Sequence, residues 1–154
     1  MLVRCKMAMI ASAETVFACV DRPEQIVQWV EGAVDHVYIS ERNPANPVGQ
    51  RFLQKLRMGK SLKEFQGEII AWEAPTHFGL YIPAPAYSSE AHFRISPDGP
   101  TKSTVNYSIE ITLHKAIVRL LSPLLRIPLT LFVKKQIGRL KRHAEKVQAD
   151  QKAN

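Results

Sequence analysis

The sequence predicts an α+β domain in which a curved, seven-stranded antiparallel sheet wraps around a long C-terminal helix. Residues 33–113 repeatedly alternate apolar and polar side chains between turn signals, a pattern typical of hairpin-connected strands. Two helix-start signals follow the first alternating segment, and apolar residues recur at helical spacing near the C-terminus. The predicted order is therefore strand, two short helices, six strands and one long helix.

The first three elements are predicted from local patterns. Residues 2–10 alternate apolar and charged side chains, which indicates a half-buried strand. Ser12 is a typical N-cap residue, so we expect a helix to start there. Asp21 gives a second cap signal, with Pro23 in the first turn, and predicts another short helix that ends near residue 32.

Six further strands follow, separated by turns rich in Pro, Gly and Asn. The alternation is most regular in the last of them, where every second residue is apolar. A Pro-Ala-Pro sequence at 83–85 should end the strand before it, because proline cannot donate a ladder hydrogen bond. We expect the six strands at residues 33–41, 50–58, 62–73, 77–82, 87–95 and 103–113.

Residues 115–147 predict one long helix whose apolar pattern changes phase near Pro128. Beyond Pro128 the apolar residues form one stripe, with Lys and Arg mostly opposite. Before Pro128 they cover most of the circumference, which indicates burial on several sides, a cavity wall or membrane contact. Because Pro128 lacks an amide hydrogen, we expect a kinked segment at the mouth of a cavity. The alternative is plain core, with Pro128 starting a second helix.

The chain of 154 residues predicts one domain, at residues 1–148, followed by a flexible tail at 149–154. Its charge is unevenly distributed. Residues 1–114 hold eleven Lys/Arg and twelve Asp/Glu, whereas residues 115–154 hold ten and two, so the C-terminal segment carries the positive charge. This basic face is either a solvated surface or a weak contact for an anionic membrane. Nucleic acid is not expected, because no recognised nucleic-acid fold motif or run of aromatic residues accompanies the basic residues.

The two cysteines, Cys5 and Cys19, are too few for a disulfide framework and predict buried thiols in a reducing compartment. The apolar stretch near the N-terminus is too short and too poor in leucine for a convincing signal peptide. No segment reaches the roughly 18 consecutive apolar residues of a spanning helix. We therefore expect a cytoplasmic protein.

Short pieces of sequence along the chain match a known family in their order and spacing. They lie at residues 10–17, 21–29, 47–52, 67–75 and 140–145. On these pieces the chain resembles the START-like superfamily, also called SRPBCC, and within it the bacterial polyketide cyclase/dehydrase-like branch. The resemblance implies the helix-grip fold, with an apolar cavity between the sheet and the C-terminal helix that binds a hydrophobic ligand.

No catalytic or metal-binding motif accompanies the resemblance. The five histidines are isolated, without HxH or HExxH spacing, and CxxC is absent, so we expect neither a metal nor another cofactor. No serine or cysteine lies in a nucleophile motif. An acid–base pair, such as Glu64 or Glu68 with Tyr81 or His36, rests on fold analogy alone. The simpler interpretation places both carboxylates on the outer face of the sheet.

Aromatic and aliphatic residues predict the cavity wall. Tyr87 and Tyr107 share strand faces with Phe93 and Ile109, so their hydroxyls would need partners or the polar end of a ligand. Each candidate alone could be ordinary packed core; the set indicates an apolar interior with a few polar groups. The candidate ligand-binding residues are Trp29, Phe52, Leu56, Phe65, Tyr87, Tyr107, Leu121, Leu125 and Phe132.

Three classes of function fit these patterns. The first is binding or transport of a small hydrophobic ligand, lipid-like or polyketide-like. The second is a cyclase- or dehydrase-type enzyme on a similar substrate. The third is a protein with a filled core that acts through its surface. The sequence favours the first class, and it assigns neither the ligand nor the oligomeric state.

Overall fold

The computed structural model describes residues 1–153. Strands and helices follow one another in the predicted order, with an additional short helix before the long one. The strands are β1 (Leu2–Met9), β2 (Ala33–Tyr38), β3 (Arg51–Met58), β4 (Ser61–Glu73), β5 (His77–Pro83), β6 (Tyr87–Gly99) and β7 (Lys102–Leu113). The helices are α1 (Ala13–Asp21), α2 (Pro23–Trp29), α3 (Ala116–Leu120) and α4 (Ser122–Ala153).

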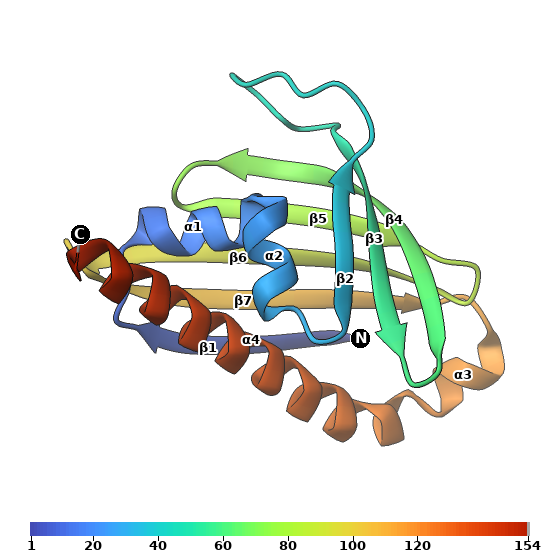
Figure 1. The fold of residues 1–154 in the computed structure, drawn as a ribbon. Coiled ribbons are helices and arrows are strands. Elements are labelled where there is room, and N and C mark those ends of the chain that lie inside the picture. Colours follow the sequence, from blue (N-terminus) through green and yellow to red (C-terminus); the bar gives the residue numbers. More distant parts are fainter. Residues whose placement is uncertain (154) are drawn as a thin grey trace.

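The seven strands form a single sheet in the order β1-β7-β6-β5-β4-β3-β2, and every neighbouring pair is antiparallel. The chain leaves one edge of the sheet at β1, passes through α1 and α2, and enters the opposite edge at β2. The sheet is curved, and α1, α2 and α4 lie against its concave side (Figure 1). This arrangement confirms the predicted helix-grip fold.

The second half of α4 anchors the helix to the body of the protein. Val133, Ile137, Leu140 and Ala144 are buried at alternating spacings of four, three and four residues, so they form one stripe on the helix. This stripe belongs to the same apolar core as the inward residues of β1, β6 and β7 and the buried residues of α1. The predicted apolar stripe of the C-terminal helix is therefore confirmed from Val133 to Ala144, whereas Phe132, which was also predicted to belong to it, is 52% exposed.

The two short helices begin differently from each other. Ser12 caps α1 as predicted, because its hydroxyl accepts a hydrogen bond from the amide of Thr15 at 3.1 Å. Asp21, the predicted cap of the second helix, does not cap it; Arg22 occupies that position without a side-chain bond. The Asp21 carboxylate instead accepts two hydrogen bonds from Arg42, both 2.9 Å long. It therefore fastens the segment after β2 to the end of α1.

The C-terminal helix is interrupted at Leu121, which was not predicted, and Pro128 does not start a second helix. α3 ends just before Leu121, and α4 starts at Ser122 and continues through Pro128. The reason lies in the other proline of the segment. Pro123 follows the first residue of α4, where no intrahelical amide hydrogen bond is needed, so it favours a helix start. Pro128 costs the helix one hydrogen bond without ending it.

α4 continues through residues 149–153, where the sequence predicts a flexible tail, and residue 154 lies outside the described residues. No helix within residues 1–153 is both long enough and apolar enough to cross a membrane.

Candidate ligand-binding site

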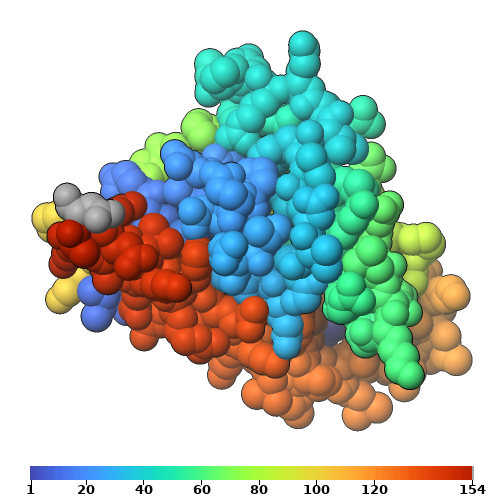
Figure 2. Space-filling view, viewed as in Figure 1, coloured from blue at the N-terminus to red at the C-terminus, as the bar shows by residue number. Residues whose placement is uncertain are grey.

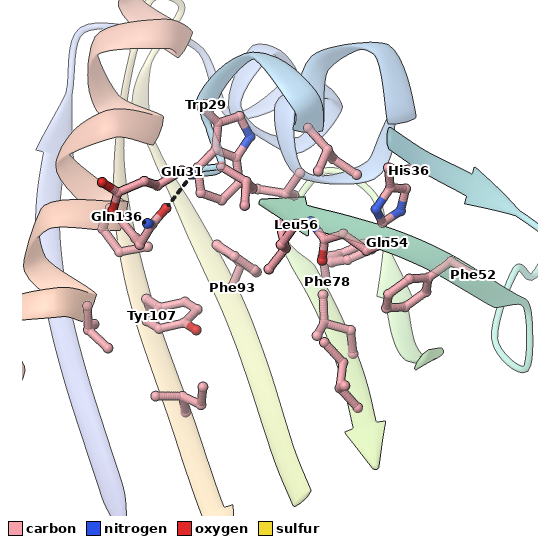
Figure 3. Close-up of a pocket in the computed structure, with 18 of the residues that line it drawn as sticks. Trp29, Glu31, His36, Phe52, Gln54, Leu56, Phe78, Phe93, Tyr107 and Gln136 are labelled. Atoms are coloured by element: carbon pink, nitrogen blue, oxygen red, sulfur yellow. Dashed lines mark hydrogen bonds between the residues drawn. The ribbon is translucent and has the colours of Figure 1, made fainter. Parts of the chain in front are cut away.

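A cavity of about 250 Å³ lies between the concave face of the sheet, α2 and α4. Its wall is mainly aliphatic and aromatic, with side chains from helices at the top and strands below (Figure 3). Ligand pockets commonly measure about 300–1,000 Å³, so this one lies just below that range. It suits a small molecule, or one end of a longer molecule.

Aromatic rings form the central wall of the cavity. Trp29 is held by a hydrogen bond from its indole N–H to the carbonyl of Cys19, 2.8 Å long. Its ring packs edge-on against Phe93, with centroids 6.3 Å apart, and Phe93 contacts Tyr107 at 4.8 Å. These rings come from α2, β6 and β7, so the sheet and the short helix set the shape of the wall together.

β4 contributes a glycine where its neighbours contribute side chains to the cavity. Gly67 lies opposite Phe52 in the β3–β4 register. A Cβ atom on Gly67 would lie 2.4 Å from the Phe52 ring and 2.8 Å from the carbonyl oxygen of Tyr81. The missing side chain therefore lets the ring of Phe52 lie against β4, where it lines one end of the cavity.

His36 Nδ1 is a buried polar atom of the wall without a hydrogen-bond partner among residues 1–153. The hydroxyl of Tyr107 and the side-chain amide of Gln54 are further polar groups of the wall. The pKa of Tyr107 is raised by burial and, to a smaller extent, by Cys5. The His36 ring is 8% exposed and stacks on Phe52, with centroids 4.9 Å apart and planes at 22°. Unpaired polar atoms in an apolar wall are the groups that can orient a ligand.

Burial keeps His36 neutral. Desolvation lowers the pKa of its imidazole from 6.5 to about 4, although the nearby Asp35 carboxylate acts in the opposite direction. A neutral imidazole offers one donor and one acceptor nitrogen. His36 can therefore hydrogen-bond an uncharged ligand group without introducing a charge into the cavity.

The depressed pKa of His36 makes the stability of the protein depend on pH. The unfolded chain binds a proton at this imidazole below about pH 6.5, whereas the folded chain binds it only near pH 4. The free energy of unfolding is therefore not reduced by His36 above pH 6.5. It falls as the pH is lowered from 6.5 toward 4, because only the unfolded chain binds the proton in this range. The loss amounts to about 3 kcal/mol. Urea unfolding at several pH values should show it for the wild type and not for His36→Phe. Parallel curves for the two proteins would contradict a neutral, buried His36.

A small polar network closes one rim of the cavity. Glu31, in the turn between α2 and β2, exchanges two hydrogen bonds with Gln136 of α4, each 3.3 Å long (Figure 3). Lys135 pairs with the same carboxylate at 3.0 Å, and Arg139 donates to the carbonyl of Trp29 at 2.7 Å. These bonds fix α4 to the turn. Glu31 is the only Asp, Glu, Lys or Arg residue of the described wall.

Five of the nine residues predicted from the sequence line the cavity, namely Trp29, Phe52, Leu56, Tyr107 and Phe132. Phe65, Tyr87, Leu121 and Leu125 do not. Phe65 lies opposite Gln54 in the sheet, but only Gln54 reaches the cavity. Tyr87 starts β6 and is 38% exposed, and the two leucines precede the part of α4 that packs on the sheet. Whether any of the nine contacts a ligand stays a prediction.

Several residues of the wall were not predicted from the sequence. Gln54 lies between Phe52 and Leu56 in the alternation of β3, so the sequence could predict that it faces inward. It was not chosen as a wall residue because its side chain is polar. His36 was less accessible to prediction, because a bulge between Ala33 and Asp35 shifts the alternation of β2. The remaining wall residues that were not among the nine are Val20, Ile26, Val30, Glu31, Tyr38, Phe78, Leu80, Ile82, Phe93, Ile109, Leu129, Val133, Gln136 and Ile137.

The acid–base pair considered from the sequence is not assembled around the cavity. Glu64 and Glu68 are exposed, and Glu64 pairs with Lys55 at 3.5 Å. Tyr81 lies opposite Glu68 in the sheet and does not line the cavity, whereas His36 does. Within residues 1–153, no group of three or more His, Cys, Asp or Glu side chains is arranged to hold a metal ion.

Comparisons with known proteins identify similar chains. A family model described as "Polyketide cyclase / dehydrase and lipid transport" matches residues 7–145. No curated protein matches the chain in a sequence search.

Solved structures share the fold at low sequence identity. TTHA0849 from Thermus thermophilus is 14% identical, with a TM-score of 0.73 over 94% of this chain and 97% of that one. A START superfamily protein from Mycobacterium smegmatis is 16% identical, with a TM-score of 0.70 over 97% of both chains. The di-domain ARO/CYC BexL, from the BE-7585A biosynthetic pathway, is 12% identical, with a TM-score of 0.77 over 94% of this chain and 46% of that one. At these identities the similarity shows a common fold.

Proposed function

This chain belongs to the polyketide cyclase/dehydrase and lipid transport family, within the START-like superfamily, and we propose that it binds or transports a small, uncharged hydrophobic ligand in the cavity. The observation that carries the proposal is an apolar cavity of about 250 Å³ whose wall holds two polar groups, the Tyr107 hydroxyl and His36 Nδ1, of which His36 Nδ1 is buried without a hydrogen-bond partner among residues 1–153. Apolar space favours a hydrophobic body, and the two polar groups favour a ligand with a hydroxyl or carbonyl group.

The charge of the wall favours a neutral ligand over a carboxylate. No Lys or Arg lines the cavity within residues 1–153, and its one carboxylate, Glu31, already pairs with Lys135. A ligand carboxylate would lose its hydration without gaining a cationic partner. A phenol or alcohol could instead donate to His36 or exchange a hydrogen bond with Tyr107.

Binding is favoured over turnover because the cavity supplies few groups for acid–base chemistry. Among the described residues, its ionisable side chains are His36, Tyr38, Tyr107 and Glu31. The Tyr38 hydroxyl already donates to the carbonyl of Asp21, and Glu31 is bonded at the rim. A cyclase or dehydrase would need an acid and a base facing the reacting atoms.

The cytoplasmic setting stays a prediction. The thiols of Cys5 and Cys19, which are buried and form no disulfide, are compatible with it.

The experiment compares two probes that share one ring system and differ in charge. A solvent-sensitive apolar dye is bound to the lipid-free protein at neutral pH and displaced with 2-naphthol or 2-naphthoate. We expect 2-naphthol to displace the dye at least about tenfold more effectively, because a buried carboxylate without a partner costs more than about 1.4 kcal/mol.

Tyr107→Phe serves as the matched variant, since it removes only the hydroxyl. We expect it to weaken 2-naphthol binding by about fivefold and to leave 2-naphthoate nearly unchanged, because a neutral hydrogen bond contributes about 1 kcal/mol. Equal displacement by the two probes would contradict the neutral-ligand proposal. Failure of the dye and both probes to bind would contradict ligand binding itself.

A further inference from the structure

We propose that α3 and the first half of α4 form a docking surface for an anionic lipid bilayer. The surface is an apolar ridge made of Ile117, Leu120, Leu121, Leu124, Ile127 and Leu131, together with the basic residues around it. This inference goes beyond ligand binding and does not depend on what the cavity holds.

The ridge is exposed along its whole length. Leu120 is 81% exposed, Leu124 74% and Ile127 71%. No residue of α3 is buried, and the first buried residue of α4 is Val133, eleven residues after the helix starts. Single exposed leucines are common, but a contiguous apolar surface of this kind marks an interaction site.

The ridge points away from the body of the protein. Leu124 and Leu131 are seven residues apart and lie on the same side of α4, with Ile127 near them. Helical spacing places this side opposite the stripe that begins at Val133 and Ile137 and packs into the core. In the space-filling view, the orange segment that includes the ridge forms the lower edge of the molecule (Figure 2).

The charges around the ridge select an anionic partner. Residues 111–144 contain eight Lys/Arg and no Asp/Glu. Lys134 lies beside the ridge on α4, on the same side as Ile127, which is seven residues before it, and it has no ion-pair partner within residues 1–153. An amphipathic helix with a basic surround and exposed leucines is typical of a segment that lies in the bilayer interface.

A second copy of the chain fits this surface less well than a bilayer. A two-fold interface brings the same patch of both copies together. The segment 111–144 would then face its own counterpart, and the like charges would repel each other. An anionic bilayer offers negative headgroups for the basic residues and an apolar layer for the leucines, so it complements both features of the ridge.

The ridge adjoins the cavity through Phe132. This side chain is 52% exposed and also lines the cavity, next to Val133 on the same helix. A bilayer docked on the ridge would therefore lie beside one wall of the cavity. If the proposed ligand binding is correct, an apolar ligand could pass between membrane and cavity with little exposure to water.

Vesicle flotation tests the docking surface directly. The full chain is mixed with phosphatidylcholine vesicles that contain or lack phosphatidylserine, at low and high salt. We expect the wild type to float only with phosphatidylserine, and high salt to release it because salt screens the charge contacts. Lys135 and Arg139 are left unchanged, because they bond to Glu31 and the Trp29 carbonyl at the cavity rim.

Two variants separate the apolar and the basic contributions. Leu124→Gln with Leu131→Gln should weaken binding by tenfold or more, since glutamine supports the helix but does not enter the apolar layer. Lys134→Gln should weaken it by about fivefold, the contribution of one cation near an anionic surface. Matched controls remove exposed apolar residues elsewhere (Ile10→Gln with Val48→Gln) or cations elsewhere (Arg51→Gln with Lys102→Gln) and should bind as the wild type does.

Three outcomes would overturn the proposal. The wild type could stay in solution with anionic vesicles at low salt. The leucine variant could float as well as the wild type, leaving the ridge without a role. A dimer could form in place of vesicle binding and be lost in the leucine variant, which would assign the ridge to a second copy. Dye binding in lipid-free buffer is measured on the same samples. If the protein floats with anionic vesicles but binds no dye, only the proposed ligand binding is overturned, and the docking surface stands.

Discussion

Replacing Leu56 and Ile109 by tryptophan together will weaken the binding of an apolar ligand by about 100-fold and leave the fold intact. Both side chains line the cavity, from β3 and β7, with three strands between them in the sheet. Two indole rings would occupy much of a space of about 250 Å³. A ligand would then have to displace at least one ring, and such overpacking costs about 1–3 kcal/mol for each ring. A total near 2.8 kcal/mol corresponds to 100-fold.

Isothermal titration with 2-naphthol measures this loss, and circular dichroism checks that the fold is kept. The control carries the same two kinds of replacement on exposed positions, Leu62→Trp with Ile39→Trp, and should bind as the wild type does. Thermal unfolding of the cavity variant should be unchanged or slightly raised, because the rings fill empty space. An intact variant that binds 2-naphthol as tightly as the wild type would show that the ligand site lies elsewhere.

Leu140→Ala will lower the free energy of unfolding by about 2–5 kcal/mol. Leu140 is completely buried in the stripe of α4 that packs into the core, so its replacement leaves a cavity as well as removing apolar contacts. A loss of this size is a large part of the total stability of a single domain. Urea unfolding at pH 7 gives the value directly.

The matched control for Leu140→Ala lies on the same helix. Leu124 is 74% exposed, and Leu124→Ala should change the free energy of unfolding by no more than about 0.5 kcal/mol. Comparing Leu140→Ala with Leu124→Ala therefore tests whether only the second half of α4 packs against the rest of the protein. Equal losses at both positions would mean that the first half of α4 is also packed against something, and the ridge would then not be free for a bilayer.

The fold was predictable because its strands and helix stripe carry simple repeating patterns. Alternation on β7 and the stripe from Val133 to Ala144 gave the correct elements and the correct inward faces. Ser12 was a correct cap for the same reason, since capping depends on residues adjacent in sequence. Features that depend on local sequence alone were thus the most reliable.

The errors concern residues whose roles depend on distant partners. Asp21 is a residue type that often caps helices. Its two carboxylate oxygens instead accept hydrogen bonds from Arg42, which is 21 residues away. Pro128 was considered as the start of a second helix, but the nearby Pro123 supplied a better helix start. At the C-terminal end, residues 149–153 extend α4, where a tail was predicted.

The candidate site was predictable only in part. Alternation placed Phe52, Leu56 and Tyr107 on inward faces, but it could not tell which inward residues reach the cavity and which fill the ends of the sheet. The β2 bulge concealed His36. The wide apolar arc of residues 117–132 left burial, a cavity wall and membrane contact open. In the structure only Leu129 and Phe132 of that arc line the cavity, and the ridge faces solvent.

The central claim is that the cavity binds an uncharged hydrophobic ligand, and NMR of methyl-labelled protein with 2-naphthol tests it most directly. We expect nuclear Overhauser contacts between the naphthol ring and the methyl groups of Leu56, Leu80 and Ile109, which line the cavity. We expect no such contacts for Leu124 and Leu131, which are exposed on the ridge. Contacts confined to the ridge, or no contacts at any ligand concentration up to saturation, would contradict the claim.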